Sequence, residues 1–203
     1  MLLKAPPETK IESIHLAVYS IKRSLGDGLS DIVPAYDSIA LFGDDCDSFI
    51  DRLSGWNEVE EENQREQIHV EIPICYEMGL DTSQLAESLK IKVEELIKIH
   101  VDGLYRSLFV GFTPGFIYAD GLDRRLFFPR KKAPRTRVPA GSVGIAGEQT
   151  GIYSLDSPGG WNIIGRTPLR LFDIGKRPPM KVQVGTSFSF RRINTEEFEA
   201  WRD

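Results

Sequence analysis

The sequence predicts an α+β protein, with a small N-terminal α/β domain over residues 1–67 and a β domain over residues 68–203. Apolar residues between positions 11 and 25 recur at helical spacing. Residues 135–166 hold seven of the eighteen glycines, with short apolar pieces between them, which is typical of short strands joined by tight turns. Charge separates the same two parts: the first 68 residues carry 6 Lys and Arg against 14 Asp and Glu, and the remainder carries 19 against 16.

The overall composition is that of an ordinary globular protein. The 203 residues are 41% hydrophobic and 27% charged, with a net charge of −5. No apolar run reaches the roughly 20 residues of a membrane helix, and the first ten residues lack the apolar core of a signal peptide, so we expect a cytoplasmic protein. The absence of a strongly basic domain gives no indication of nucleic-acid binding.

The cysteines and histidines do not predict a metal site. Cys46 and Cys75 form no CxxC motif, and the three histidines lie far from one another along the chain. We therefore expect free buried thiols rather than a disulfide or a bound metal.

The N-terminal part is predicted to contain two helices around a strand region. The first helix covers residues 11–25 and is stopped by glycines. Residues 31–42 are predicted to form one long strand or a strand pair, and residues 44–53 a short helix. The charged segment 58–67 is expected to connect the two domains.

The β domain is predicted to start with a strand and two helices. Residues 69–76 alternate apolar with other side chains, and Pro73 favours an edge position or a bulge there. Asp81 is placed to cap a helix that runs to position 89, and a second helix is expected over residues 92–100. His100, at the end of that helix, is a candidate for a charged residue beside the helix C-terminus. The alternatives are a packed or solvent-facing histidine, which is favoured, and a catalytic one.

Strands and turns are predicted for most of the rest of the chain. The segment TPGF at 113–116 is a turn, and residues 124–137 hold seven basic residues and no acid. Thr195 is expected to cap a last short helix. The remaining strands are predicted over residues 104–112, 169–172, 181–184 and 187–193.

The glycine-rich stretch 135–166 is also the candidate binding site. Glycine allows positive φ and close approach of a backbone, and the planar fork of arginine suits carboxylate and phosphate. On a strand, Arg135 and Arg137 would share one face. The hypothesis is a cleft of backbone amides and arginines that holds an anionic or carboxamide-like ligand. The alternative is a compact β domain whose turns simply need glycine. The glycines match neither the Walker nor the Rossmann spacing, so neither kind of nucleotide site is supported.

Longer motifs between residues 113 and 173 indicate a family. The blocks PRTRVPAGSVGIAG, QTGIY, SPGGW and IIGRTPLRLFD follow one another in this order. Together they resemble the allophanate hydrolase subunit 1 family, whose members include subunits of 5-oxoprolinase and KipI-type inhibitors of sporulation kinases. A weaker similarity extends back through EIPICY (71–76) and DIVPAYDSIALF (31–42).

The resemblance implies a fold, partners and a reaction. The fold would be a small N-terminal α/β domain followed by a cyclophilin-like β-barrel domain. The partners would be a homologous, KipA-like subunit 2, which shares a cleft with this chain, and a third 5-oxoprolinase subunit. The reaction would be ATP-driven hydrolysis of 5-oxo-L-proline to L-glutamate, with ATP used by the complex at a site not assigned to this chain. The isolated subunit is expected to be inactive.

Two other functions stay open at this point. One is a KipI-like regulator that binds a sporulation histidine kinase and performs no chemistry. The other is a carboxyltransferase component that acts on urea-like amides, because fused homologues form the carboxyltransferase part of urea carboxylase.

Under the favoured hypothesis, three arginines contact the anion. No paired carboxylates stand out as acid and base, so no catalytic residue is assigned. The candidate substrate-binding residues are Arg135, Thr136, Arg137, Gln149, Ser157, Gly159, Gly160, Trp161 and Arg166.

The other candidates have supporting roles. Gln149 and the amides near Gly159 and Gly160 would orient a carboxamide or stabilise an oxyanion, as preorganised donors do. Ser157 is a possible donor, and no base beside it is evident for a nucleophilic role. Trp161 either walls the pocket or fills the β core.

The sequence departs from the family pattern at several places. No strand is evident before the predicted helix around Ile14, so either the N-terminal domain lacks its first strand or the start of the domain is misplaced. PGFIYADGL stands where PGFPYLGGL is usual, and Lys92 stands where serine usually caps a helix. Glu148 replaces a glycine and is expected to bring a negative charge beside the anion cleft.

Overall fold

A computed structural model describes residues 1–4, 30–35, 38–44 and 69–202 of the chain. The chain divides into two compact units, Met1–Glu66 and Gln67–Asp203. The two predicted helices of the N-terminal part and the charged segment 58–67 lie outside the described residues.

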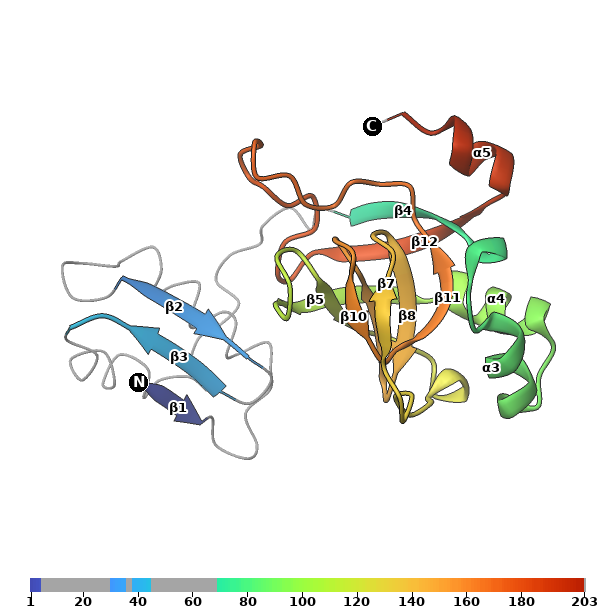
Figure 1. The fold of residues 1–203 in the computed structure, drawn as a ribbon, viewed down its shortest axis with the longest axis horizontal. Coiled ribbons are helices and arrows are strands. Elements are labelled where there is room, and N and C mark those ends of the chain that lie inside the picture. The colour runs from blue at the N-terminus through green and yellow to red at the C-terminus, as the bar shows by residue number, and fades with distance from the viewer. Residues whose placement is uncertain (5–29, 36–37, 45–68, 203) are drawn as a thin grey trace. The chain divides into compact units, whose positions relative to one another are not determined.

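The described part of the first unit is a three-stranded antiparallel sheet in the order β1-β3-β2 (Figure 1). Its strands are β1 (Leu2–Lys4), β2 (Asp31–Pro34) and β3 (Ser38–Phe42). The strand pair predicted over residues 31–42 is confirmed. The expected lack of a first strand is wrong, because β1 pairs with β3. Three residues are too few for an alternating pattern to be visible in the sequence.

The second unit is built on a closed barrel of seven strands, in the order β11-β4-β12-β5-β6-β9-β8 (Figure 1). Neighbouring strands are antiparallel except β4 and β12, which run parallel from His69↔Ser187 to Cys75↔Ile193. The α+β class with a barrel is thus confirmed. The barrel strands are β4 (His69–Cys75), β5 (Leu104–Val110), β6 (Ile117–Asp120), β8 (Ser142–Ala146), β9 (Gln149–Ile152), β11 (Asn162–Arg166) and β12 (Ser187–Ile193).

Pro73 lies in β4 and has no backbone N–H to donate to a neighbouring strand, which costs little at this position. On one side β4 pairs with β12 along its whole length. On the other side it pairs with β11 only at Cys75↔Arg166. Most of β4 therefore has an unpaired flank toward β11, which is the edge-like position that proline tolerates.

Helices join or follow the strands near the predicted positions. A short 3₁₀ turn, η2 (Tyr76–Met78), leads to α3 (Thr82–Leu89) and α4 (Val93–Val101), and η3 (Arg124–Leu126) follows β6. The last helix, α5 (Thr195–Ala200), begins one residue earlier than a Thr195 cap would place it. Asn194 is its N-cap and forms a capping box with Glu197, so the assignment of Thr195 as the cap is wrong.

Two predicted strands are absent from the described residues. Positions 169–172 and 181–184 form irregular loops, tied together by the isolated bridge between Phe172 and Met180. Pro178 and Pro179 lie between these segments, and proline cannot donate to a strand ladder. None of the helices in the described ranges is long and apolar enough to cross a membrane.

His100 is fully buried in the core of the second unit. Its Nδ1 lies 2.7 Å from the Tyr76 hydroxyl and its Nε2 lies 3.2 Å from the Thr150 hydroxyl. Its ring stacks on Phe190. Burial lowers the pKa of His100 to about 3, so it is a neutral core residue and the charged alternative is wrong.

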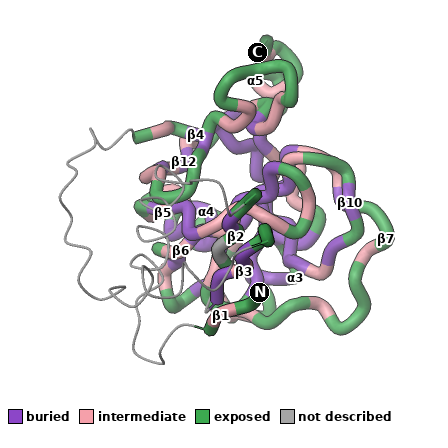
Figure 2. Tube along the Cα trace, turned by 90° about the vertical axis from the view of Figure 1, so that its left-hand side faces the viewer, coloured by how far each residue is buried: buried purple, intermediate pink, exposed green. Residues whose placement is uncertain are grey.

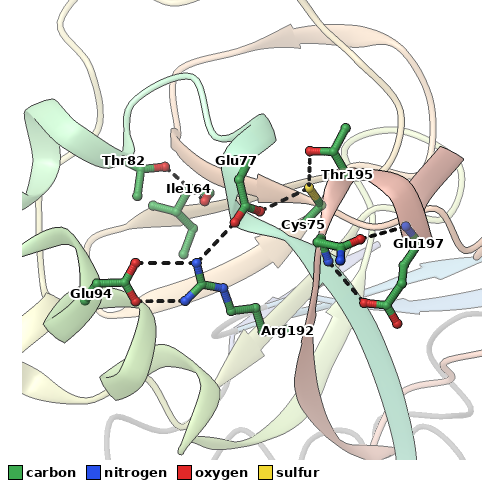
Figure 3. Close-up of polar contacts among 9 residues, drawn as sticks. Cys75, Glu77, Thr82, Glu94, Ile164, Arg192, Thr195 and Glu197 are labelled. Carbon is green, nitrogen blue, oxygen red and sulfur yellow. Dashed lines mark hydrogen bonds and ion pairs between the residues drawn. The ribbon is translucent and has the colours of Figure 1, made fainter.

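An ion-pair network ties β12 to the start of the helical segment (Figure 3). The Arg192 guanidinium donates to Glu94 of α4 at 2.8 Å and to Glu77 of η2 at 3.1 Å. The thiol of Cys75 donates to the Glu77 carboxylate at 3.3 Å. Burial raises the pKa of this thiol. Cys75 is free and buried as predicted, whereas Cys46, for which the same was predicted, lies outside the described residues.

Candidate functional site

The glycine-rich stretch 135–166 supplies three strands of the barrel, β8, β9 and β11, and also a two-stranded antiparallel ribbon beside it. The strands of the ribbon are β7 (Arg135–Val138) and β10 (Ser157–Gly159). The register pairs Ser157 with Val138 and Gly159 with Arg135, with an irregularity between them. The middle of β7 is exposed, as Figure 2 shows. The ribbon therefore presents one surface to solvent.

The inner side of the ribbon rests on an apolar cluster of its own. Val138 is fully buried there. Gly159 is required at this place, because a side chain on it would clash with the Tyr153 hydroxyl. The other members of the cluster are Phe116, Ala146, Tyr153, Trp161 and Ile163.

A buried carboxylate anchors the ribbon to the rest of the unit. Asp81 has a side chain that is only 3% exposed, and its Oδ1 accepts from Arg135 Nη2 at 2.6 Å and from Lys131 Nζ at 2.7 Å. Its Oδ2 accepts from the backbone amide of Ile163 at 2.7 Å. Burial by itself would raise the pKa of Asp81, but the hydrogen bonds from Arg135 and Lys131 outweigh it and the pKa lies below its usual range.

Asp81 does not serve α3 in the way the sequence suggested. It occupies the N-cap position, yet its side chain makes no capping hydrogen bond. The hydroxyl of Thr82, the first residue of α3, donates to the Ile164 carbonyl of β11 at 3.0 Å and so ties the start of the helix to the barrel (Figure 3). The expected cap is therefore an anchor for two cations.

Arg137 forms a second, exposed ion pair. Its Nε and Nη2 donate to Asp156 Oδ2 at 2.9 and 2.6 Å, and Asp156 Oδ1 accepts from the Ala140 amide at 2.7 Å. The Ala140 amide and then Arg137 lower the pKa of Asp156. Arg135 and Arg137 thus go to different carboxylates, because the irregular ribbon breaks the simple alternation of an ideal strand.

Arg166 lies at the end of β11 and contacts Ala140, the residue whose amide donates to Asp156. Its Nε donates to the Ala140 carbonyl at 2.8 Å. Its guanidinium lies 5.6 Å from the centre of the Phe198 ring of α5. The turn at Ala140 therefore brings Arg166 near the Arg137–Asp156 pair.

The remaining candidates are spread along the ribbon and the barrel. Thr136 is exposed. The Gly160 carbonyl accepts from the Lys131 amide at 2.7 Å, and Trp161 is 5% exposed in the apolar cluster. Gln149 Nε2 and Ser157 Oγ are buried and have no hydrogen-bond partner among the described residues.

Glu148 is not one of the carboxylates that pair with these arginines. It is exposed in the two-residue turn between β8 and β9. Within the described part of the chain, no ion pair joins it to Arg135, Arg137 or Arg166. The expected negative charge beside the arginines comes instead from Asp81 and Asp156, whose positions the sequence did not indicate.

The arrangement offers donors for binding and no evident nucleophile. Ser157 has no histidine partner in the described ranges, and the buried His100 is occupied by Tyr76 and Thr150. Cationic and amide donors of this kind recognise an oxygen-bearing ligand.

Comparison with known proteins gives a consistent family. The model of the family described as carboxyltransferase domain, subdomain C and D, matches residues 3–182. The B subunit of 5-oxoprolinase from Bacillus subtilis is 35% identical over 94% of this chain and 86% of that protein. The B subunit of 5-oxoprolinase from Haemophilus influenzae is 35% identical over 91% of this chain and 89% of that protein.

Solved structures share the fold. A conserved uncharacterised protein from Pyrococcus horikoshii matches with a TM-score of 0.63 and 39% identity, over 97% of this chain and 95% of that one. TTHA0988 matches with a TM-score of 0.83 and 33% identity over 96% of this chain, which spans only 40% of that longer protein. The Kluyveromyces lactis urea amidolyase matches at a TM-score of 0.69 over 93% of this chain and 14% of that one, and at 17% identity it shows likeness of fold alone.

Proposed function

This chain belongs to the carboxyltransferase domain family, subdomain C and D, and we propose that it is the B subunit of a 5-oxoprolinase. The complex would hydrolyse the lactam of 5-oxo-L-proline to give L-glutamate. The observation that carries the proposal is the 35% identity to the B. subtilis protein, which extends over 94% of this chain and 86% of that protein. A match of this length includes both the first unit and the barrel.

The relatives are named as one subunit of an enzyme, which supports an assembly of several chains. We propose that this chain works in the cytoplasm with a homologous subunit 2 and a third subunit, and that the complex uses ATP to activate the lactam carbonyl. TTHA0988 supports a larger functional unit, because the part that matches this chain occupies 40% of that protein.

The geometry of the ribbon agrees with a binding role inside such a complex. Arg135, Arg137 and Lys131 provide cationic donors, whereas no nucleophile with an adjacent base is present among the described residues. The partner subunits would then supply the groups that react, and this chain would position the substrate.

The test is glutamate formation by the reconstituted complex. This chain would be co-expressed with the two proposed partner subunits and supplied with 5-oxo-L-proline and ATP. The expected result is L-glutamate, formed only when ATP and all subunits are present. A stable complex that contains every subunit and yields no glutamate would refute the proposal, and leaving this chain out is the control.

A further inference from the structure

We propose that Arg135 binds the carboxylate of the substrate, and that Asp81 and Lys131 are the residues that position and support it. The ligand class is a small lactam acid such as 5-oxo-L-proline. The identity of that ligand rests on the proposed function, whereas the choice of Arg135 rests on its contacts in this structure.

The structure distinguishes Arg135 from the other two candidate arginines. Arg137 is 78% exposed and places both Nε and Nη2 on Asp156. Arg166 donates from Nε to the Ala140 carbonyl and lies over the Phe198 ring. Arg135 combines a side chain that is only 26% exposed with a buried Nη1 that has no hydrogen-bond partner among the described residues.

A guanidinium nitrogen that is buried and unpaired is unfavourable, because it has lost water and gained no acceptor. Nη2 of the same group is already held by Asp81 at 2.6 Å. The fork of arginine carries donors on separate nitrogens, so an arriving oxygen can bind Nη1 without displacing Asp81. A carboxylate oxygen suits this donor best, since charge-assisted hydrogen bonds are the stronger kind.

The local charge also favours an anion. Arg135 and Lys131 both contact one oxygen of Asp81, so two cations share a single carboxylate. Both are largely buried, with side chains 26% and 23% exposed. One positive charge is therefore unmatched within this group of three, and an anionic ligand would neutralise it.

A second unpaired donor lies on the same ribbon. Ser157 is 6% exposed, and its hydroxyl has no partner in the part of the chain that the structure describes. It is two positions from Gly159, which faces Arg135 in the register of β7 and β10. The ribbon thus carries an unsatisfied buried group on each of its two strands, as expected for a site that is completed by a ligand.

Asp81 is a positioning residue in this proposal. It fixes Arg135 through one oxygen and the backbone amide of Ile163 in β11 through the other. This connects the cation to the barrel wall. Lys131 is tied to the ribbon as well, because its backbone amide donates to the Gly160 carbonyl.

The experiment compares two ligands that differ by one carboxylate. Calorimetry would measure the Kd of 5-oxo-L-proline and of 2-pyrrolidinone, which lacks the carboxylate, for the complex of this chain with its proposed partners. Arg135→Lys keeps a positive charge that can pair with Asp81 but removes the free Nη1. Arg137→Lys is the matched control on the same strand.

We expect wild-type protein to prefer 5-oxo-L-proline, and Arg135→Lys to weaken its binding about 10- to 100-fold, the effect of a lost charge-assisted hydrogen bond. Binding of 2-pyrrolidinone should change by less than about 3-fold, so that the preference for the acid is lost. Arg137→Lys should retain the preference. Asp81→Asn removes the contact that fixes Arg135, and we expect this loss to outweigh the added positive charge and to weaken 5-oxo-L-proline binding. A rise in the KM for 5-oxo-L-proline without a change in the KM for ATP would mark a positioning effect.

Several results would overturn the inference. These are no binding of 5-oxo-L-proline by the wild-type complex, equal loss of both ligands in Arg135→Lys, or the same loss in Arg137→Lys. Thermal unfolding of each variant identifies a folding defect, and if Asp81→Asn does not fold, Arg135→Lys still decides. Glutamate formation is scored separately. Binding through Arg135 without glutamate formation would refute the proposed function alone, and glutamate formation with an unchanged KM in Arg135→Lys would refute this inference alone.

Discussion

Arg135 Nη2 lies 2.6 Å from Oδ1 of Asp81, across 54 positions of sequence. This pair joins the exposed ribbon to the residue that precedes α3. With Lys131 on the same oxygen and the Ile163 amide on the other, Asp81 connects the candidate site to the barrel.

Replacing Asp81 by Asn should destabilise the second unit. Asn keeps the size and an oxygen that can accept from Ile163, but it leaves Lys131 and Arg135 without their counter-charge. We expect the free energy of unfolding to fall by roughly 2 to 3 kcal/mol, less than for a fully buried pair because both cations are partly solvated. Urea unfolding followed by tryptophan fluorescence measures it. Asp156→Asn, at the exposed pair, is the control and should cost below about 1 kcal/mol; equal losses would contradict the anchoring role.

The contribution of Asp81 should depend on pH in acid only. Its pKa is lower in the folded protein than its ordinary value, so the stabilisation is complete above the unfolded pKa of about 4 and is lost as pH falls through the lower folded value. The difference in unfolding free energy between wild type and Asp81→Asn should therefore be constant from pH 7 to 5 and should shrink below about pH 4. Urea titrations across this range measure it, and a difference that already shrinks above pH 5 would count against the assignment.

His100 should make the folded protein less stable as pH falls, and its effect should begin at a higher pH than that of Asp81. Its pKa is about 3 in the folded protein and about 6.5 in an unfolded chain. The unfolded state therefore binds an extra proton below pH 6.5, and stability should fall by up to about 1.4 kcal/mol per pH unit between these values. His100→Gln stays neutral and should remove this part of the slope. NMR of the imidazole ring gives an independent measurement, and a titration midpoint near pH 6 in the folded protein would contradict the prediction.

The sequence predicted the elements well where a local pattern determines them. The strands predicted over residues 69–76 and 187–193 correspond to β4 (His69–Cys75) and β12, although in β4 every residue from Ile72 to Cys75 is buried and only its first part follows an alternating pattern. The parallel pairing of these two strands joins segments more than a hundred positions apart, and no local signal encodes it. β1 escaped notice because three residues carry no period.

The site was predicted less completely than the fold. The glycines and arginines of 135–166 marked a stretch that supplies both the ribbon and three barrel strands, because turns and close backbone approach need glycine. Their counter-charges were not foreseen, since Asp81 was predicted to cap a helix and Asp156 was given no role. The expectation that Arg135 and Arg137 act together assumed an ideal strand, whereas the irregular register of β7 and β10 sends them to separate carboxylates.

Replacing Gly159 by a larger residue should destabilise the protein because of one neighbour, Tyr153. A methyl group there would clash with the Tyr153 hydroxyl, so Gly159→Ala should lower the unfolding free energy by about 1 to 3 kcal/mol, as overpacking does. Gly160→Ala is the matched control one position along the chain. Its methyl group would lie 3.5 Å or more from its nearest neighbours, and we expect an effect below about 0.5 kcal/mol.

A double-variant cycle separates this clash from a general need for glycine in the ribbon. Tyr153→Phe removes the hydroxyl oxygen that a methyl group on Gly159 would meet first, while the ring carbons remain close. If the clash is the cause, the Gly159→Ala penalty should be clearly smaller in the Tyr153→Phe background, with a coupling energy of about 0.5 kcal/mol or more. Strictly additive effects would instead show that the hydroxyl oxygen is not the decisive contact and would assign the penalty to the ring carbons of residue 153, which a methyl group on Gly159 would also meet below 3.0 Å.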